Sequence, residues 1–286
     1  MGFQGLLLVA LAPGLFWLWF FTRLDRYNPA PRRLIITSFI LGAFSTIPAV
    51  ILETVFLGDA ELGAAAGLAA VAMTMLLVVG PVEELSKFSV VRLFPYRSLY
   101  FDEPMDGLVY AAAASLGFAS LENLGYVLSF GPEVMVLRAP LSTLAHVIFG
   151  SVWGYALGLH VQSGYKRGWL VAGGVMLAAM VHGLFNIAVF TNFWAAVGIV
   201  VIGGVWTFRR FKWGQRISPF RFKRNYPEVE CPTCHRLNRV LSRYCRFCGA
   251  HAPATYDALY CGFCKTRNRS DATFCTKCGD RLLTRG

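Results

Sequence analysis

The chain has 286 residues, of which 56% are hydrophobic and only 15% are charged, and its mean hydropathy is +0.51. That composition is too apolar for a soluble domain of this length and excludes an ordinary water-soluble enzyme. Residues 1–208 hold 10 Lys+Arg against 11 Asp+Glu, a net charge of −1. Residues 209–286 hold 17 against 5, a net of +12, together with all eight cysteines. The sequence therefore predicts a membrane part followed by a basic, cysteine-rich tail.

Apolar stretches long enough to cross a bilayer, about 20 residues each, follow one another through the first part of the chain. Lys- and Arg-containing loops alternate with neutral or acidic ones, which by the positive-inside rule predicts an external N-terminus and a cytosolic C-terminus. Cytosolic placement agrees with a tail whose thiols stay reduced. We expect an all-α polytopic bundle with about seven spans, at 3–21, 34–57, 64–94, 106–128, 140–160, 169–190 and 192–208.

The cysteines of the tail form two units with identical spacing, C-x2-C-x10-C-x2-C, offset by 30 residues. Four thiolates bind zinc tetrahedrally, and each C-x2-C turn presents two sulfurs to one ion. A glycine, Gly249 or Gly279, follows the last cysteine of each unit and suits a tight turn. Phe247, Phe263 and Phe274 are candidates for the small apolar core. The pattern predicts two structural zinc ions, held by Cys231, Cys234, Cys245 and Cys248, and by Cys261, Cys264, Cys275 and Cys278.

The sequence divides into a membrane-embedded domain over 1–208, a basic linker over 209–230, and zinc ribbons over 231–249 and 261–279. Each four-thiolate zinc site carries a charge of about −2, so the two sites reduce the basicity of the tail by about a third. Most of the remaining positive charge lies in the linker, where anionic lipid headgroups are the favoured partner. For the ribbons we favour a cytosolic protein partner over nucleic acid.

Charged side chains are costly in hydrocarbon and mark functional candidates. Glu83, Glu84 and Lys87 lie together in the third span. Glu83 and Lys87 are four residues apart and can pair, whereas Glu84 points about 100° round the helix, towards a cavity. An unpaired buried carboxylate suits general base work, although a charge cluster at the membrane boundary is an equally good interpretation of this segment alone.

Further polar residues lie on other spans. Asp106 follows two acids that suit a helix start, Glu122 is embedded in an apolar helix rich in small residues, and His146 lies alone. His182 and Asn186 are four residues apart and share a helix face. Glutamate and histidine together can ligate a divalent metal such as zinc and activate water, or do acid–base chemistry without one. We interpret Glu53 as a boundary or packing residue.

Depth in the membrane is the difficulty. If the third span began near Gly63, Glu83 would lie about 30 Å along it, at the inner edge, while the histidines lie near the outer ends of theirs. We expect the span to begin near Ala70, with 60–68 as an outer loop. A bend at Pro81 is the alternative.

The combined order and spacing of these motifs resemble the PrsW family, intramembrane proteases of the clan that includes CAAX prenyl endopeptidases and Abi proteins. The motifs, over about residues 64–190, are Glu83-Glu84-x2-Lys87, Phe101-x4-Asp106-Gly-Leu-Val-Tyr110, Gly117-Phe118-x3-Glu122-Asn123, His146 and His182-x3-Asn186. The resemblance implies a prokaryotic cell membrane and cleavage of a membrane-anchored protein, an anti-sigma factor in the type case. It implies essential roles for Glu83, Glu84 and His182, and an oxyanion- or water-orienting role for Asn186. Glu122 stands where relatives have histidine.

We therefore expect an intramembrane endopeptidase, dependent on either a metal or glutamate. Glu83 or Glu84 would activate water, His182 and Asn186 would stabilise the oxyanion, and His146 with Glu122 would hold the water, the substrate or a metal. Lys87 and Asp106 would support the site. Two alternatives remain open: an inactive membrane scaffold that presents zinc ribbons, and a proton-coupled transporter.

Overall fold

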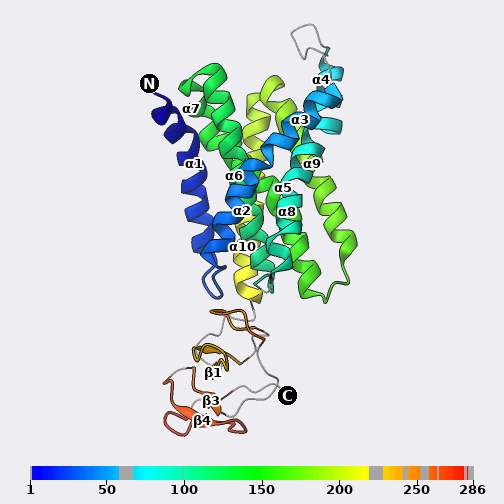
Figure 1. Ribbon diagram of the computed structural model, residues 1–286. Helices are drawn as coiled ribbons and strands as arrows, with labels where there is room; N and C mark the ends of the chain where they lie inside the picture. Colours follow the sequence, from blue (N-terminus) through cyan, green and yellow to red (C-terminus); the bar gives the residue numbers. More distant parts are fainter. Residues whose placement is uncertain are drawn as a thin grey trace. The chain divides into compact units, whose positions relative to one another are not determined.

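The structure is a computed structural model that describes residues 2–57, 67–98, 100–218, 228–240, 244–251, 258–262, 264–279 and 282. It divides into two compact units, Met1–Ser218 and Pro219–Gly286. The first unit is helical, and the described part of the second contains short strands (Figure 1). The expected all-α bundle followed by two small cysteine modules is confirmed.

The helical unit contains ten α-helices within its described residues, joined in places by short 3-10 and π-helical segments. The α-helices are α1 (Phe3–Leu24), α2 (Arg32–Phe44), α3 (Thr46–Leu57), α4 (Leu68–Thr74), α5 (Gly80–Leu93), α6 (Pro104–Phe130), α7 (Met135–Leu137), α8 (Thr143–Gln162), α9 (Gly168–Thr191) and α10 (Phe193–Ile217). The other segments are η1 (Met75–Val79, π), η2 (Pro95–Arg97, 3-10), η3 (Pro132–Val134, 3-10) and η4 (Arg138–Ser142, π).

Within the described residues, six helical stretches are long and apolar enough to cross a membrane: Phe3–Leu24, Arg32–Leu57, Leu68–Arg97, Pro132–Gln162, Gly168–Thr191 and Phe193–Ile217. The seventh expected span corresponds to α6, whose 27 residues also suffice in length at about 1.5 Å each. Glu122 and Asn123 lower its hydropathy. The last helix continues to Ile217, through the first part of the segment expected to be a linker.

Helix α6 is the centre of the bundle, because its residues from Pro104 to Ser120 are all buried. Helices α1, α2 and α8 pack against it, and Figure 1 shows it among them. Small residues permit this packing. A Cβ atom added at Gly117 would collide with the Phe39 carbonyl oxygen of α2, and one added at Gly154 would lie 2.5 Å from the Gly107 carbonyl oxygen of α6. The small residues of α6 therefore allow the backbones of its neighbours to approach closely.

The third span begins at Leu68, close to the expected start near Ala70. Most of the loop expected at 60–68 lies outside the described residues. The π-helical segment η1 lies directly before Gly80 and Pro81, so the carboxylates of α5 follow an irregular turn. Because an extra residue in a helical turn rotates everything after it, η1 helps to aim this part of α5.

Among its described residues, the second unit contains an antiparallel four-stranded sheet with the order β2-β1-β3-β4. Its strands are β1 (Glu228–Glu230), β2 (Leu237–Arg239), β3 (Ala258–Tyr260) and β4 (Arg267–Arg269). Each ribbon contributes one hairpin, and the Glu228↔Tyr260 pair joins the two hairpins. Val229, Val240 and Leu259 form a shared apolar cluster across the junction.

Candidate active site and metal centres

Glu84 is held from three sides in the interior of the bundle. Its Oε1 atom lies 2.6 Å from Lys87 Nζ and 2.8 Å from His182 Nδ1, and its Oε2 atom accepts a hydrogen bond of 2.9 Å from Trp153 Nε1. Both Glu84 and Lys87 are fully buried. The expectation that Glu84 faces a cavity is therefore wrong. A lysine side chain is long enough to reach the carboxylates three and four residues before it, and here it lies closer to the nearer one.

Of the two adjacent glutamates, Glu83 is the one that lines a cavity inside the bundle. Its Oε2 atom lies 3.4 Å from Lys87 Nζ, 3.6 Å from His182 Nε2 and 3.9 Å from His146 Nδ1. The residues that seemed to lie at different depths thus meet at one point, where α5, α8 and α9 converge.

The two histidines face Glu83 through one ring nitrogen each, and a carboxylate holds the other nitrogen. His182 Nδ1 contacts Glu84 Oε1 at 2.8 Å, and His146 Nε2 contacts Glu122 Oε2 at 2.9 Å. Glu122 is in turn paired with Arg138 Nη2 at 3.0 Å. A carboxylate behind a histidine fixes the tautomer and the ring orientation, as at protein metal sites.

A cavity of about 420 Å³ lies against these groups. Its polar lining includes Glu83, Glu122, His146, His182 and Asn186, all five predicted from the sequence, so the structure brings them to one place. The cavity is also lined by residues that sequence reasoning did not assign to the site, namely Glu53 of α3, Tyr126 of α6 and Arg138 of η4.

Asp106 lies elsewhere. Its Oδ2 atom accepts backbone hydrogen bonds of 3.0 Å from Asp102 and 2.9 Å from Glu103, which completes a capping box at the start of α6. Glu122 is 16 residues further along the same helix, about 24 Å away at 1.5 Å per residue. Asp106 thus serves the helix end.

Glu83, His146 and His182 fit a divalent metal. Each offers one ligand atom, and these atoms lie within 4.8 Å of one another. Two imidazoles and one carboxylate form a common ligand set of catalytic zinc sites. Lys87 Nζ lies 3.0 Å from His146 Nδ1, the nitrogen that such an ion would take, so a bound ion would require the ammonium group to turn towards Glu84. This set could hold a catalytic metal.

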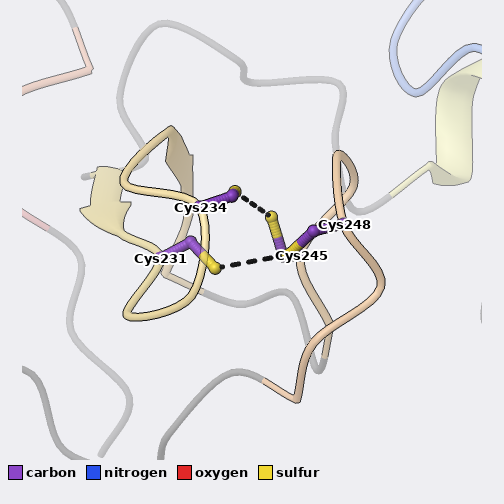
Figure 2. A group of neighbouring side chains, drawn as sticks. All are labelled: Cys231, Cys234, Cys245 and Cys248. Atoms are coloured by element: carbon purple, nitrogen blue, oxygen red, sulfur yellow. Dashed lines mark hydrogen bonds between the residues drawn. The ribbon is translucent and has the colours of Figure 1, made fainter.

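The eight cysteines form two four-thiol clusters, as the sequence predicts. Figure 2 shows the first cluster, in which Cys234 Sγ lies 3.6 Å from Cys245 Sγ, and Cys231 Sγ lies 3.6 Å from Cys248 Sγ. The corresponding pairs of the second cluster lie 3.6 and 3.5 Å apart. Four sulfurs about 2.3 Å from one ion at tetrahedral angles lie about 3.8 Å apart, so both clusters could bind structural zinc.

The backbone of each cluster is arranged for thiolates. A backbone N–H of Cys234 lowers the pKa of the Cys231 thiol to about 6, and that of Cys278 does the same for Cys275. Gly249 and Gly279 have φ angles of +76° and +71°, as the predicted turns require. The expected aromatic core is wrong: Phe247 and Phe274 are 44% and 58% exposed, and Phe263 lies outside the described residues. Aliphatic strand residues fill that core.

Buried carboxylates, imidazoles and a lysine inside an apolar helical bundle define a polytopic membrane protein with a reactive centre in its interior. The family profile described as PrsW family intramembrane metalloprotease matches residues 30–208, and the chain belongs to this family. The resemblance seen in the sequence is confirmed, and the chain is an intramembrane protease. All the residues that line the cavity lie inside the matched stretch.

Curated relatives agree with the family profile. The chain is 31% identical to Protease PrsW of Geobacillus kaustophilus over 181 aligned residues, and these residues make up 63% of this chain and 78% of the relative. Protease PrsW of Halalkalibacterium halodurans is 30% identical over 182 residues, 63% of this chain and 81% of the relative. Protease PrsW of Bacillus subtilis is 31% identical over 178 residues, 62% of this chain and 78% of the relative. No solved structure matches the chain significantly.

Proposed function

We propose that the chain is a metal-dependent intramembrane endopeptidase in which Glu83, His146 and His182 hold one divalent ion. Two imidazoles and one carboxylate favour zinc as this ion. The observation that carries this proposal is the convergence of three ligand atoms within 4.8 Å, at the wall of a cavity inside the bundle. An ion bound there would lower the pKa of water and polarise a peptide carbonyl.

Charge balance supports a divalent cation at this position. If ionised, Glu53, Glu83, Glu84 and Glu122 carry four negative charges around the cavity, against two positive charges on Lys87 and Arg138. The remaining −2 is costly in a medium of low dielectric constant unless a cation neutralises it. One divalent ion would neutralise this charge of −2.

The other residues have distinct roles in this proposal. Glu84 and Glu122 are positioning residues, because they contact the far nitrogens of His182 and His146. Glu84 has no exposed surface and cannot reach the cavity. Of the two glutamates, we therefore assign Glu83 to the reacting centre. Asn186 lines the cavity one helical turn from His182, where its amide can orient water or the substrate carbonyl.

The substrate in this proposal is a membrane-anchored regulatory protein, with an anti-sigma factor as the precedent from the family resemblance. The cysteine clusters hold two structural zinc ions and contact a cytosolic protein that controls or locates the protease. The basic residues of the linker, including Arg209, Arg210 and Lys212 at the end of α10, meet anionic headgroups.

The decisive experiment compares membrane proteomes. Cells that produce the wild-type chain or Glu83→Ala are analysed for new N-termini of membrane proteins by terminal labelling and mass spectrometry. We expect cleavage products that fall more than about 100-fold with Glu83→Ala, because even the partners behind metal ligands contribute 10–100-fold. Glu133→Ala, which removes a carboxylate from a segment outside the cavity, is the matched control and should cleave normally. Equal product levels in both variants would refute the proposal.

A further inference from the structure

The unassigned carboxylate of the cavity is Glu53. It lies on α3, a helix whose other side chains are largely directed to the surroundings: Val55 is 71% exposed and Phe56 is 66% exposed. Glu53 instead lines the cavity, together with Thr46, Ala49 and Val50 of the same helix. Glu53 is thus the single ionisable residue of α3, and it lies on the face of the helix that lines the cavity.

The other carboxylates of this centre already have partners. Glu84 contacts Lys87, His182 and Trp153. Glu122 contacts His146 and Arg138, and Glu83 faces both histidines. By contrast, Glu53 Oε1 is buried and has neither a hydrogen-bond partner nor an ion-pair partner among the described residues, whereas Glu122 has two ion-pair partners. A buried acceptor without a partner is costly, which points to a donor supplied by something that enters the cavity.

A second hollow adjoins the cavity on the side that α3 forms. This hollow of about 620 Å³ runs between α3 and α6, and Thr46, Val50, Glu122 and Tyr126 line both the hollow and the cavity. Apart from Glu122 its wall is mainly apolar, with Ile47, Ile51, Leu124 and Leu128. An apolar substrate segment lying between α3 and α6 would therefore reach Glu83 and the histidines along the side of the cavity that α3 forms.

A peptide must be extended at the bond that is cut, so its helix opens and its backbone N–H groups lose their partners. In hydrocarbon no water replaces those partners, and each N–H group needs an acceptor from the protein. Resting on the proposed protease function, we propose that Glu53 contacts the substrate: its Oε1 atom accepts a hydrogen bond from a backbone N–H of the opened segment and holds it across the cavity.

In this role Glu53 differs from the reacting groups, because it binds the substrate and takes no part in the bond cleavage. Glu53 acts as a hydrogen-bond acceptor, so an amide oxygen can replace the carboxylate. Glu53→Gln should keep KM within about twofold of wild type, whereas Glu53→Leu should raise KM about tenfold, the fold-change of one lost hydrogen bond. The kcat of both variants should stay near wild type, because the contact is equal in ground and transition states.

The measurement uses the full-length protein in detergent micelles and a quenched fluorescent peptide that spans a cleavage site mapped with the wild-type protein. Val55→Ala, on the exposed side of the same helix, is the matched control. Bound metal per chain and thermal unfolding are measured for every variant, and both should be unchanged. In addition, a photo-crosslinking amino acid at position 53 should label the peptide, whereas the same group at position 55 should not.

Three results would overturn the inference. An unchanged KM in Glu53→Leu would exclude the contact. A loss of kcat in Glu53→Gln equal to that in Glu53→Leu would assign Glu53 to proton transfer or metal binding. Equal labelling from positions 53 and 55 would exclude a defined contact. Failure of the proposed function is distinguishable, because the peptide would then be cut as fast by Glu83→Ala as by wild type.

Discussion

At the scale of single residues, the Glu84–Lys87 pair contributes to stability as well as to chemistry. Both side chains are fully buried and 2.6 Å apart. Removing one member of a buried ion pair costs about 3–5 kcal/mol, because the other charge stays in the interior. We therefore expect Glu84→Ala to unfold at a clearly lower temperature than Glu83→Ala, measured on purified protein in detergent. Equal unfolding temperatures of the two variants would show that the buried charge of Lys87 is stabilised equally well without Glu84.

Trp153 provides a second test at this scale. Its indole N–H donates to Glu84 Oε2 at 2.9 Å, and Glu84 orients His182. Trp153→Phe keeps the ring but removes the donor, so we expect cleavage to fall about 10–100-fold while the fold is retained. Trp169→Phe, at a position that is 73% exposed, should cleave like wild type. A Trp153→Phe variant with full activity would contradict the positioning role of Glu84.

The sequence predicted five of the polar residues that line the cavity, because polar and charged residues in apolar spans are rare and costly. Glu83, Glu122, His146, His182 and Asn186 were all found in this way. Glu53 carried the same signal but stood alone, without a motif, and was interpreted as packing. Arg138 was not predicted to belong to the site, because nothing in its local sequence indicates that η4 brings it to Glu122. Contacts between segments far apart in the chain carry no local pattern.

At the scale of elements, the packing of α2 on α6 depends on the absence of a side chain at Gly117. We expect Gly117→Ala to destabilise the protein by about 1–3 kcal/mol, since its methyl group would meet the Phe39 carbonyl oxygen and force the helices apart. Gly173→Ala is the control: nothing lies within 4 Å of its added Cβ, and alanine favours helix. Denaturant unfolding compares the two, and equal stabilities would contradict the packing argument.

The helices were predictable to within a few residues where they are long and apolar, as at α1, α6 and α9. Their interruptions were not. The break between α2 and α3 at Ser45 and the π-helical segments η1 and η4 each lie within four residues of a proline, namely Pro48, Pro81 and Pro140. A proline ring displaces the carbonyl group four residues before it, but it does not by itself determine whether the turn breaks or widens. Hydropathy averaged over a span does not register a single extra residue in a turn, although that residue decides which side chains face the cavity.

At the scale of the whole molecule, the reactive centre and the cysteine clusters lie in separate compact units. A chain truncated after Ser218 should therefore still cut the fluorescent peptide at a rate within about threefold of the full-length protein, because no cavity residue is removed. Substrate choice in cells should change if the ribbons bind a partner. Complete loss of peptide cleavage by a folded truncated protein would mean that the tail takes part in catalysis.

Metal content distinguishes the two units. The three ligand groups predict three divalent ions per full-length chain and one per truncated chain, measured by elemental analysis of purified protein. Because the two ribbons share a sheet and an apolar cluster, loss of one zinc should weaken the other site, and Cys231→Ser should lower the content by more than one ion. Loss of one ion alone would show that the ribbons fold independently.

A lysine within a metal-type donor set gives the bundle a resident cation. With its ammonium 3.0 Å from His146 Nδ1 and 3.4 Å from Glu83 Oε2, Lys87 moderates the repulsion among the carboxylates before any ion arrives. Lys87 thus offsets part of the negative charge whether or not an ion is bound, and by turning its ammonium group towards Glu84 it would leave His146 Nδ1 to a metal. Under the proposed function, the same lysine would therefore serve both as a structural counter-charge and as the group that moves when the ion binds.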